Sequence, residues 1–197
     1  VALRVRSAWG TFVAPDEAIV LEISSRGGPA EIWSASISNP HPPLVYLLLS
    51  AWLEAGRGDL WVRLFPILLT ALGLLLLART TAALLGRSRA LVALALVAAS
   101  PTLVPSTTEV RPYPLLFVLA AASIEALRLS TRPAPGGRTL AALAFAALAS
   151  LSVASHYSAI LLLAGLFPWA AARAARNLTA PAERALALAV WAVPAAA

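Results

Sequence analysis

The chain has 197 residues, of which 60% are hydrophobic and only 12% are charged, and its mean hydropathy is +0.81. An ordinary soluble domain carries about 25% charged residues, so this composition argues against a soluble protein and predicts one that lies in a membrane. The net charge of +6 comes from arginines scattered singly between apolar runs, which is unlike the basic stripe of a nucleic-acid-binding surface. Cysteine is absent, which excludes disulfide and thiolate chemistry.

Residues 1–59 are mixed in character and predict a folded loop region ahead of the membrane helices. They hold six of the nine acidic residues. Two short helices are expected here, one over 16–25 with Pro15 at its start and one over 44–52. A helix needs about 20 residues to span a bilayer, so both are expected to lie at the membrane interface.

From Leu60 onward, long apolar runs alternate with arginines, as in membrane-spanning helices. The second run contains Pro101 and Pro105, which are expected to bend or end its helix. Residues 139–172 carry no charge over about 34 positions, or about 50 Å of helix, so they predict a hairpin that turns at 155–158. The predicted spans are 62–84, 90–107, 112–128, 139–155, 157–172 and a partial span at 185–197.

The predicted fold is therefore all-α: a polytopic transmembrane helical bundle over 60–197, preceded by a large first external loop over 1–59 that carries two juxtamembrane helices. Methionine is absent even at position 1, and the chain stops inside an apolar run. We therefore expect the sequence to be a portion of a longer protein.

The placement of arginine predicts which side of the membrane each loop faces, because short cytoplasmic loops carry an excess of basic residues. The short loops of one side hold only Arg111, which places residues 1–59 on the non-cytoplasmic face. Most acidic residues and both histidines, His41 and His156, then gather on that face. The other side holds nine arginines: Arg79, Arg87, Arg89, Arg128, Arg132, Arg138, Arg173, Arg176 and Arg184.

Three polar features of the outer face are candidates for chemistry. Asp16 and Glu17 begin a predicted helix, where they either act in a site or only favour the positive end of the helix dipole. Glu109 and Arg111 lie in a short turn between two spans, where charged groups at membrane depth are costly and commonly functional, although a simple turn pair is an equal alternative. His156 lies in the next outer turn and is either structural or a neighbour of this site.

The order of these motifs along the chain resembles that of membrane glycosyltransferases of the GT-C class. The closest likeness is to the bacterial dolichyl-phosphate-mannose–protein mannosyltransferase and aminoarabinose transferase group, which is glycosyltransferase family 39-like. Each motif is weak alone, but their order, sidedness and spacing carry the likeness over nearly the whole chain. The motifs are Asp16-Glu17, His41-Pro42-Pro43-Leu44, Arg63-Leu64, the Ser-x-x-Glu-x-Arg-x-Tyr segment from Ser106 to Tyr113, and Ser155-His156-Tyr157.

The resemblance implies an inverting enzyme that moves a sugar from a polyprenyl-phosphate donor to a protein, lipid or glycan acceptor. The reaction would take place at the non-cytoplasmic face of a bacterial inner (plasma) membrane. Asp16 matches the catalytic acidic position, which acts on the acceptor hydroxyl as general base or orients it, and Glu17 is its neighbour in the motif. Glu109 matches a second acidic position that holds the acceptor or a divalent metal, and His156 matches a possible ligand of that metal, whose identity the sequence leaves open.

The resemblance also assigns residues to substrate binding. Arg111 and, less directly, Arg63 match positions for the donor phosphate, to which a guanidinium can bond through two nitrogens. His41, Tyr113 and Tyr157 lie in the matched motifs and are assigned to substrate contacts.

Two further classes of function compete with a transferase. A transporter or flippase of lipid-linked or anionic solutes is expected to carry polar groups near the bilayer midplane, whereas here they gather at one surface. A membrane peptidase would use His41, His156 and Glu109, but the sequence lacks the His-Glu-x-x-His pattern of such enzymes.

Overall fold

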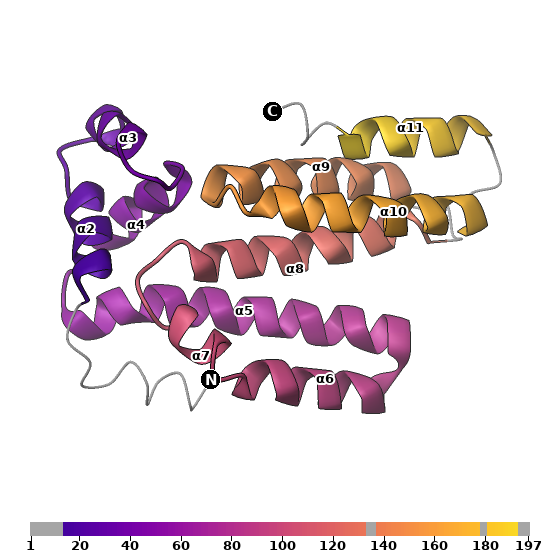
Figure 1. Cartoon of the computed structure of the whole chain (residues 1–197), viewed down its shortest axis with the longest axis horizontal. Helices are drawn as coiled ribbons and strands as arrows, with labels where there is room; N and C mark the ends of the chain where they lie inside the picture. The colour runs from indigo at the N-terminus through magenta and orange to yellow at the C-terminus, as the bar shows by residue number, and fades with distance from the viewer. Residues whose placement is uncertain (1–13, 133–136, 178–180, 193–197) are drawn as a thin grey trace.

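The computed structural model describes residues 14–132, 137–177 and 181–192, and these residues form helices joined by short connections, without a strand (Figure 1). The all-helical prediction is confirmed. In chain order the helices are α2 (Pro15–Ser24), α3 (Pro29–Ile37), α4 (Leu44–Glu54), α5 (Asp59–Leu85), α6 (Arg87–Ala99), α7 (Leu103–Ser106), α8 (Tyr113–Ser130), α9 (Arg138–Ser155), α10 (Ala159–Asn177) and α11 (Pro181–Ala192).

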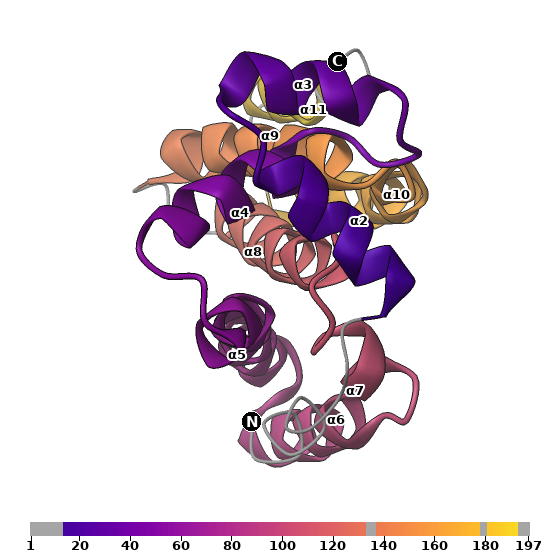
Figure 2. The same ribbon diagram turned by 90° about the vertical axis from the view of Figure 1, so that its left-hand side faces the viewer.

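Four of the described helices are long and apolar enough to cross a membrane: α5, α8, α9 and α10. They correspond, within about two residues at their starts, to the predicted spans 62–84, 112–128, 139–155 and 157–172, apart from α5, which begins at Asp59, and the turn between α9 and α10 falls at residues 156–158. The prediction of a polytopic helical membrane bundle is thus confirmed. In Figure 1 these helices run side by side, and α2, α3 and α4 lie across one end of them, which we call the capped end. Figure 2 looks along the bundle from that end and shows α2 and α3 lying across it.

The opposite end of the bundle is rich in arginine. The ends of α5, α8 and α10 and the starts of α6, α9 and α11 lie there. The nine arginines assigned above to one side of the membrane lie within about two turns of these helix ends. We call it the arginine-rich end. Part of the expected turn over 131–138, residues 133–136, lies outside the described residues, as do residues 1–13 of the first loop and 193–197 of the last expected span.

The second expected span, 90–107, is not one continuous helix. It is divided into α6, of 13 residues, and α7, of four. Proline lacks a backbone N–H, so Pro101 cannot donate to the carbonyl of Val97, and the helix ends at Ala99. The two pieces together return the chain to the capped end beside α5 (Figure 1).

The first loop contains a helix that the sequence analysis did not foresee. Besides the two expected helices, which appear as α2 and α4, the loop forms α3. Pro29 occupies its first turn, where the missing N–H costs nothing, and Glu31 lies near its positive end. The same rule that placed a helix start at Pro15 would have found this one.

Helices α2, α3 and α4, which we call the cap, pack onto the bundle through a continuous apolar core. Tyr46 and Leu49 of α4 are fully buried and belong to the same cluster as Phe65 of α5 and Leu115 of α8. Trp52 and Trp61 form a reciprocal pair of hydrogen bonds, in which the indole N–H of each donates to the backbone carbonyl of the other, at 2.9 and 3.0 Å. Their rings also stack, with centroids 4.4 Å apart. The cap is therefore positioned by the same contacts that hold the helices together.

At the arginine-rich end, α5 and α8 are joined by the buried carboxylate of Glu125. Its oxygens accept hydrogen bonds from Nε and Nη2 of Arg128, at 2.7 and 2.8 Å, and from Oγ1 of Thr80 at 2.8 Å. Arg79 adds an ion pair at 3.1 Å. Glu125 and Arg128, three positions apart on α8, thus form an ion pair that extends to Thr80 and Arg79 of the neighbouring helix α5.

Candidate functional site

The candidate site lies at the capped end, where three segments far apart in the sequence meet. They are the start of α2, the turn 107–112 between α7 and α8, and the turn between α9 and α10. These segments carry Asp16, Glu109 and His156, respectively. Arg111 and Tyr113 connect the two acids to the histidine.

Glu17 is the residue that holds two of these segments together. Its side chain is almost fully buried, and its Oε1 accepts hydrogen bonds from Nη1 of Arg63 at 2.9 Å and from the backbone N–H of Val110 at 2.8 Å. Its Oε2 accepts the backbone N–H of Ala14 at 2.9 Å, which satisfies a donor at the start of α2. The carboxylate thus ties α2 and α5 to the turn that carries Arg111.

This arrangement separates the roles of the two adjacent acids. Glu17 points into the protein and is engaged by its three donors, so its geometry is that of a positioning residue. The Asp16 side chain is 62% exposed and makes one ion pair, from Oδ2 to Nη2 of Arg111, at 3.1 Å. Of the two, Asp16 is the one that a substrate can reach.

Arg111 lies between two carboxylates. Its Nη2 contacts Asp16, and its Nη1 lies 3.5 Å from Oε2 of Glu109. The guanidinium also lies over the ring of Tyr113, 5.1 Å from its centroid, in a cation–π arrangement. A rigid fork held by an aromatic face is suited to binding a phosphate or another carboxylate.

Arg63, the other residue expected at the donor phosphate, is placed differently. Its side chain is only 11% exposed, and it bonds to Glu17 below the surface that carries Arg111. This buried pair was not among the predictions from the sequence. The signal was present, because an arginine near the start of a long apolar helix requires a partner if it does not reach water.

Two histidines and a tyrosine form a row of rings beside Arg111. The ring centroids of His41 and His156 are 5.1 Å apart, and those of His156 and Tyr113 are 5.4 Å apart. The backbone N–H of Ser158 lies 3.2 Å from Nδ1 of His156. Since that nitrogen accepts this bond, the neutral ring carries its proton on Nε2. Tyr157, in the same turn, is 59% exposed and available to contact a substrate.

The loop that carries His41 is fixed by Tyr46. The Tyr46 hydroxyl donates to Oδ1 of Asn39 at 2.8 Å, and burial raises the pKa of Tyr46 to about 12. Nδ1 of His41 is buried and has no hydrogen-bond partner within the described part of the chain. This nitrogen is therefore a polar atom for which a ligand or water would supply a partner.

Both histidines favour the neutral state. Burial is the main cause that lowers the pKa of His41, and the neighbouring His156 and Arg111 lower it further, against an opposing effect of Asp16. Burial and then Arg111 lower the pKa of His156. The row of rings thus presents uncharged imidazoles at neutral pH.

The expected metal ligands, His156 and Glu109, have different neighbours in the structure. Glu109 faces Arg111, whereas His156 contacts His41 and Tyr113. Over residues 14–132, 137–177 and 181–192 there is no group of three histidine or acidic side chains arranged to hold a metal ion. A divalent metal at this end of the bundle therefore stays a prediction.

Comparison with family models, with curated proteins and with solved structures found no match to this chain. The geometry of the site combines an accessible carboxylate, a guanidinium shared by two acids and a row of neutral aromatic rings, all at one end of a membrane bundle.

Proposed function

We propose that the chain belongs to a membrane glycosyltransferase of the GT-C class, which transfers a sugar from a polyprenyl-phosphate donor to an acceptor hydroxyl at the capped end. The observation that carries the proposal is the position of Arg111 between Asp16 and Glu109. The guanidinium of Arg111 is suited to binding a phosphate, and the carboxylate of Asp16 beside it is suited to accepting a proton. Both lie at the end of a membrane bundle, where the headgroup of a lipid would arrive.

The proposed reaction uses these residues in a simple sequence. The donor phosphate binds the guanidinium of Arg111 and replaces Asp16 there, which leaves the Asp16 carboxylate free to accept a proton. The acceptor hydroxyl gives its proton to Asp16 as its oxygen attacks the anomeric carbon, opposite the phosphate. The bond from that carbon to the phosphate oxygen breaks, the configuration inverts, and Arg111 stabilises the charge on the departing polyprenyl phosphate.

Glu109 and the row of rings complete the proposed site. Glu109 holds the second guanidinium nitrogen of Arg111, so the fork keeps its orientation when Asp16 is released. His41, His156 and Tyr113 offer flat, largely uncharged surfaces beside the phosphate position, where we place the sugar. The acceptor is a hydroxyl of a protein, lipid or glycan, since the proposed chemistry requires only the hydroxyl.

We also propose that the capped end faces the periplasm of a bacterial inner membrane. The support is the segregation of arginines, because cytoplasmic loops carry the excess of basic residues. The chain has no cysteine, so single cysteines report the topology directly. In intact cells, Tyr157→Cys is expected to react with a membrane-impermeant maleimide and Arg176→Cys to react only after lysis; the opposite pattern would overturn the sidedness.

The activity is tested by incubating the purified protein in membranes with a panel of radiolabelled polyprenyl-phosphate sugars and isolating labelled products. Product with the unaltered protein and none with Asp16→Asn would support the proposal. Glu22→Gln is the matched control, because Glu22 is an exposed acid of the same helix that pairs only with Arg26 among the described contacts. Uptake or flipping of the lipid by proteoliposomes, without a glycosyl product, would favour a transporter instead.

A further inference from the structure

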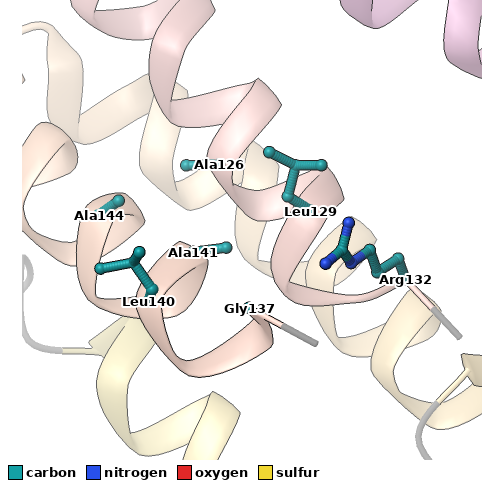
Figure 3. A pocket seen from close by; sticks show the side chains of 7 residues that line it. All are labelled: Ala126, Leu129, Arg132, Gly137, Leu140, Ala141 and Ala144. Atoms are coloured by element: carbon teal, nitrogen blue, oxygen red, sulfur yellow. The ribbon is translucent and has the colours of Figure 1, made fainter. Parts of the chain in front are cut away.

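A small cavity lies between the facing ends of α8 and α9, at the arginine-rich end (Figure 3). Its volume is about 260 Å³, and its walls are mainly apolar: Ala126 and Leu129 of α8 face Leu140, Ala141 and Ala144 of α9. Pockets for drug-sized ligands measure about 300–1,000 Å³, so this one fits only part of a flexible molecule. Leu140 is 73% exposed, and the cavity therefore opens onto the outside of the bundle, which lipid covers.

Arg132 lies at the rim of this cavity. Its Nε is buried and has no hydrogen-bond partner among the residues that the structure describes. The side chain packs closely on Gly137, where a Cβ would lie 3.3 Å from Nη2 of Arg132. Figure 3 shows the guanidinium beside the last turn of α8, near Gly137. A buried donor without a partner is uncommon in proteins, and it indicates a missing acceptor.

The charges around the cavity favour an anion. Arg138 lies beside Arg132 and donates from Nε to its backbone carbonyl at 2.8 Å. Glu125 is the acidic residue of α8, and its carboxylate is already bonded to Arg79 and Arg128. The negative charge of Glu125 is therefore balanced by these two arginines and does not neutralise Arg132.

We propose that this cavity and Arg132 form a binding site for an anionic glycerophospholipid of the leaflet at the arginine-rich end. One acyl chain occupies the apolar cavity, and the phosphate accepts hydrogen bonds from the guanidinium of Arg132. The site lies at the opposite end of the bundle from Asp16, so it is independent of the proposed transfer reaction. It combines the two contacts that hold an anionic lipid on a protein, namely an apolar slot and a basic group at headgroup depth.

Native mass spectrometry of the purified protein from nanodiscs tests the site. The nanodiscs contain equal amounts of phosphatidylglycerol and phosphatidylethanolamine, and the measured quantity is the retained lipid of each kind. The unaltered protein is expected to retain phosphatidylglycerol selectively, and Arg132→Ala to lose this adduct about fivefold, as for removal of one basic contact to anionic lipid. Arg176→Ala is the matched control, because Arg176 is an exposed arginine at the same end, away from the cavity.

A second variant tests the contribution of the apolar cavity to lipid binding apart from that of the arginine. Ala144→Leu narrows the cavity and leaves every arginine in place, so it is also expected to lower the retention of phosphatidylglycerol, while a thermal unfolding curve verifies that the variant is folded. Equal losses in Arg132→Ala and Arg176→Ala would overturn the proposal, since they would indicate a diffuse charge effect. Equal retention of both phospholipids, or displacement of phosphatidylglycerol by an equal amount of polyprenyl phosphate, would overturn it as well.

Discussion

The carboxylate of Glu17 accepts the backbone N–H of Val110 at 2.8 Å, across 93 positions of sequence. The same oxygen accepts Nη1 of Arg63 at 2.9 Å. Because Val110 lies between Glu109 and Arg111, and Glu17 follows Asp16, this single buried group links the segment that carries Asp16 to the segment that carries Arg111. Glu17, which is buried, therefore positions Asp16, which is exposed to solvent.

Glu17→Gln is therefore expected to destabilise the protein strongly. The substitution keeps the shape of the side chain but removes the charge that compensates the buried Arg63, and breaking a buried pair in this way costs about 3–5 kcal/mol. Thermal unfolding of the purified protein measures the effect. Glu22→Gln removes an exposed pair with Arg26 and is expected to change stability by less than about 1 kcal/mol. If the two variants unfold alike, the role given to Glu17 is wrong.

Asp16→Asn is expected to have the opposite profile, with a stable fold and strongly reduced transfer. The Asp16 side chain is 62% exposed and makes one surface ion pair, so the loss of its charge has little effect on packing. If Asp16 is the general base, its removal lowers the rate by about 10²–10⁴-fold. The measurements are sugar transfer at saturating donor and thermal unfolding on the same preparation. Transfer at the unaltered rate would remove Asp16 from the mechanism.

Arg111→Lys tests the proposed contact with the donor phosphate. Lysine keeps the positive charge but lacks the planar fork that bridges two acceptors and lies on Tyr113. We expect KM for the donor to rise about tenfold, as for the loss of one good charged hydrogen bond, whereas KM for the acceptor changes little. Arg26→Lys is the control. A rise confined to the acceptor KM would contradict the assignment of the phosphate to Arg111.

The sequence was informative where a local rule governs the structure. Pro15 indicated the start of α2, and an apolar length of about 50 Å indicated the hairpin of α9 and α10. The break at Pro101 was expected as a bend or an end, but how much helix survives on either side depends on packing. The structure therefore has two separate helices, α6 and α7, where one span was expected.

The candidate site was less predictable, because its roles depend on contacts between distant segments. Asp16 and Glu17 are adjacent acids, and neither composition nor spacing indicates which one is buried against Arg63 and Val110. The same holds for Glu109, whose pairing with Arg111 was an open alternative and is found in the structure. Adjacent polar residues acquire different roles only when the fold assigns them different partners.

The two histidines predict a loss of stability in mild acid. Burial lowers the pKa of both His41 and His156 in the folded protein, so the unfolded chain binds more protons once the pH falls below about 6.5. Stability is therefore unaffected by these groups above that pH, declines as the pH falls through the window below it, and levels off once both folded-state rings are protonated. Unfolding temperatures between pH 5 and 8 measure this dependence. His156→Gln, which removes one of the two rings, is expected to make the decline shallower, and an unchanged decline would contradict this account.

The close approach of α5 and α8 predicts that Gly73 does not tolerate a side chain. A Cβ at Gly73 would lie 2.6 Å from Cδ1 of Phe117 and 3.3 Å from the backbone Cα of Val118, and the second contact limits how far the helices can shift to relieve the first. Gly73→Ala is therefore expected to destabilise the protein by about 1–3 kcal/mol, although alanine is the better helix former. Gly165→Ala in α10 is the matched control, because its Cβ would meet nothing within 4 Å, and there the higher helix propensity is expected to add about 0.5–1 kcal/mol of stability. Thermal unfolding of both variants gives opposite signs if the interface of α5 and α8 is packed as described; stabilisation by Gly73→Ala would show that these two helices lie further apart.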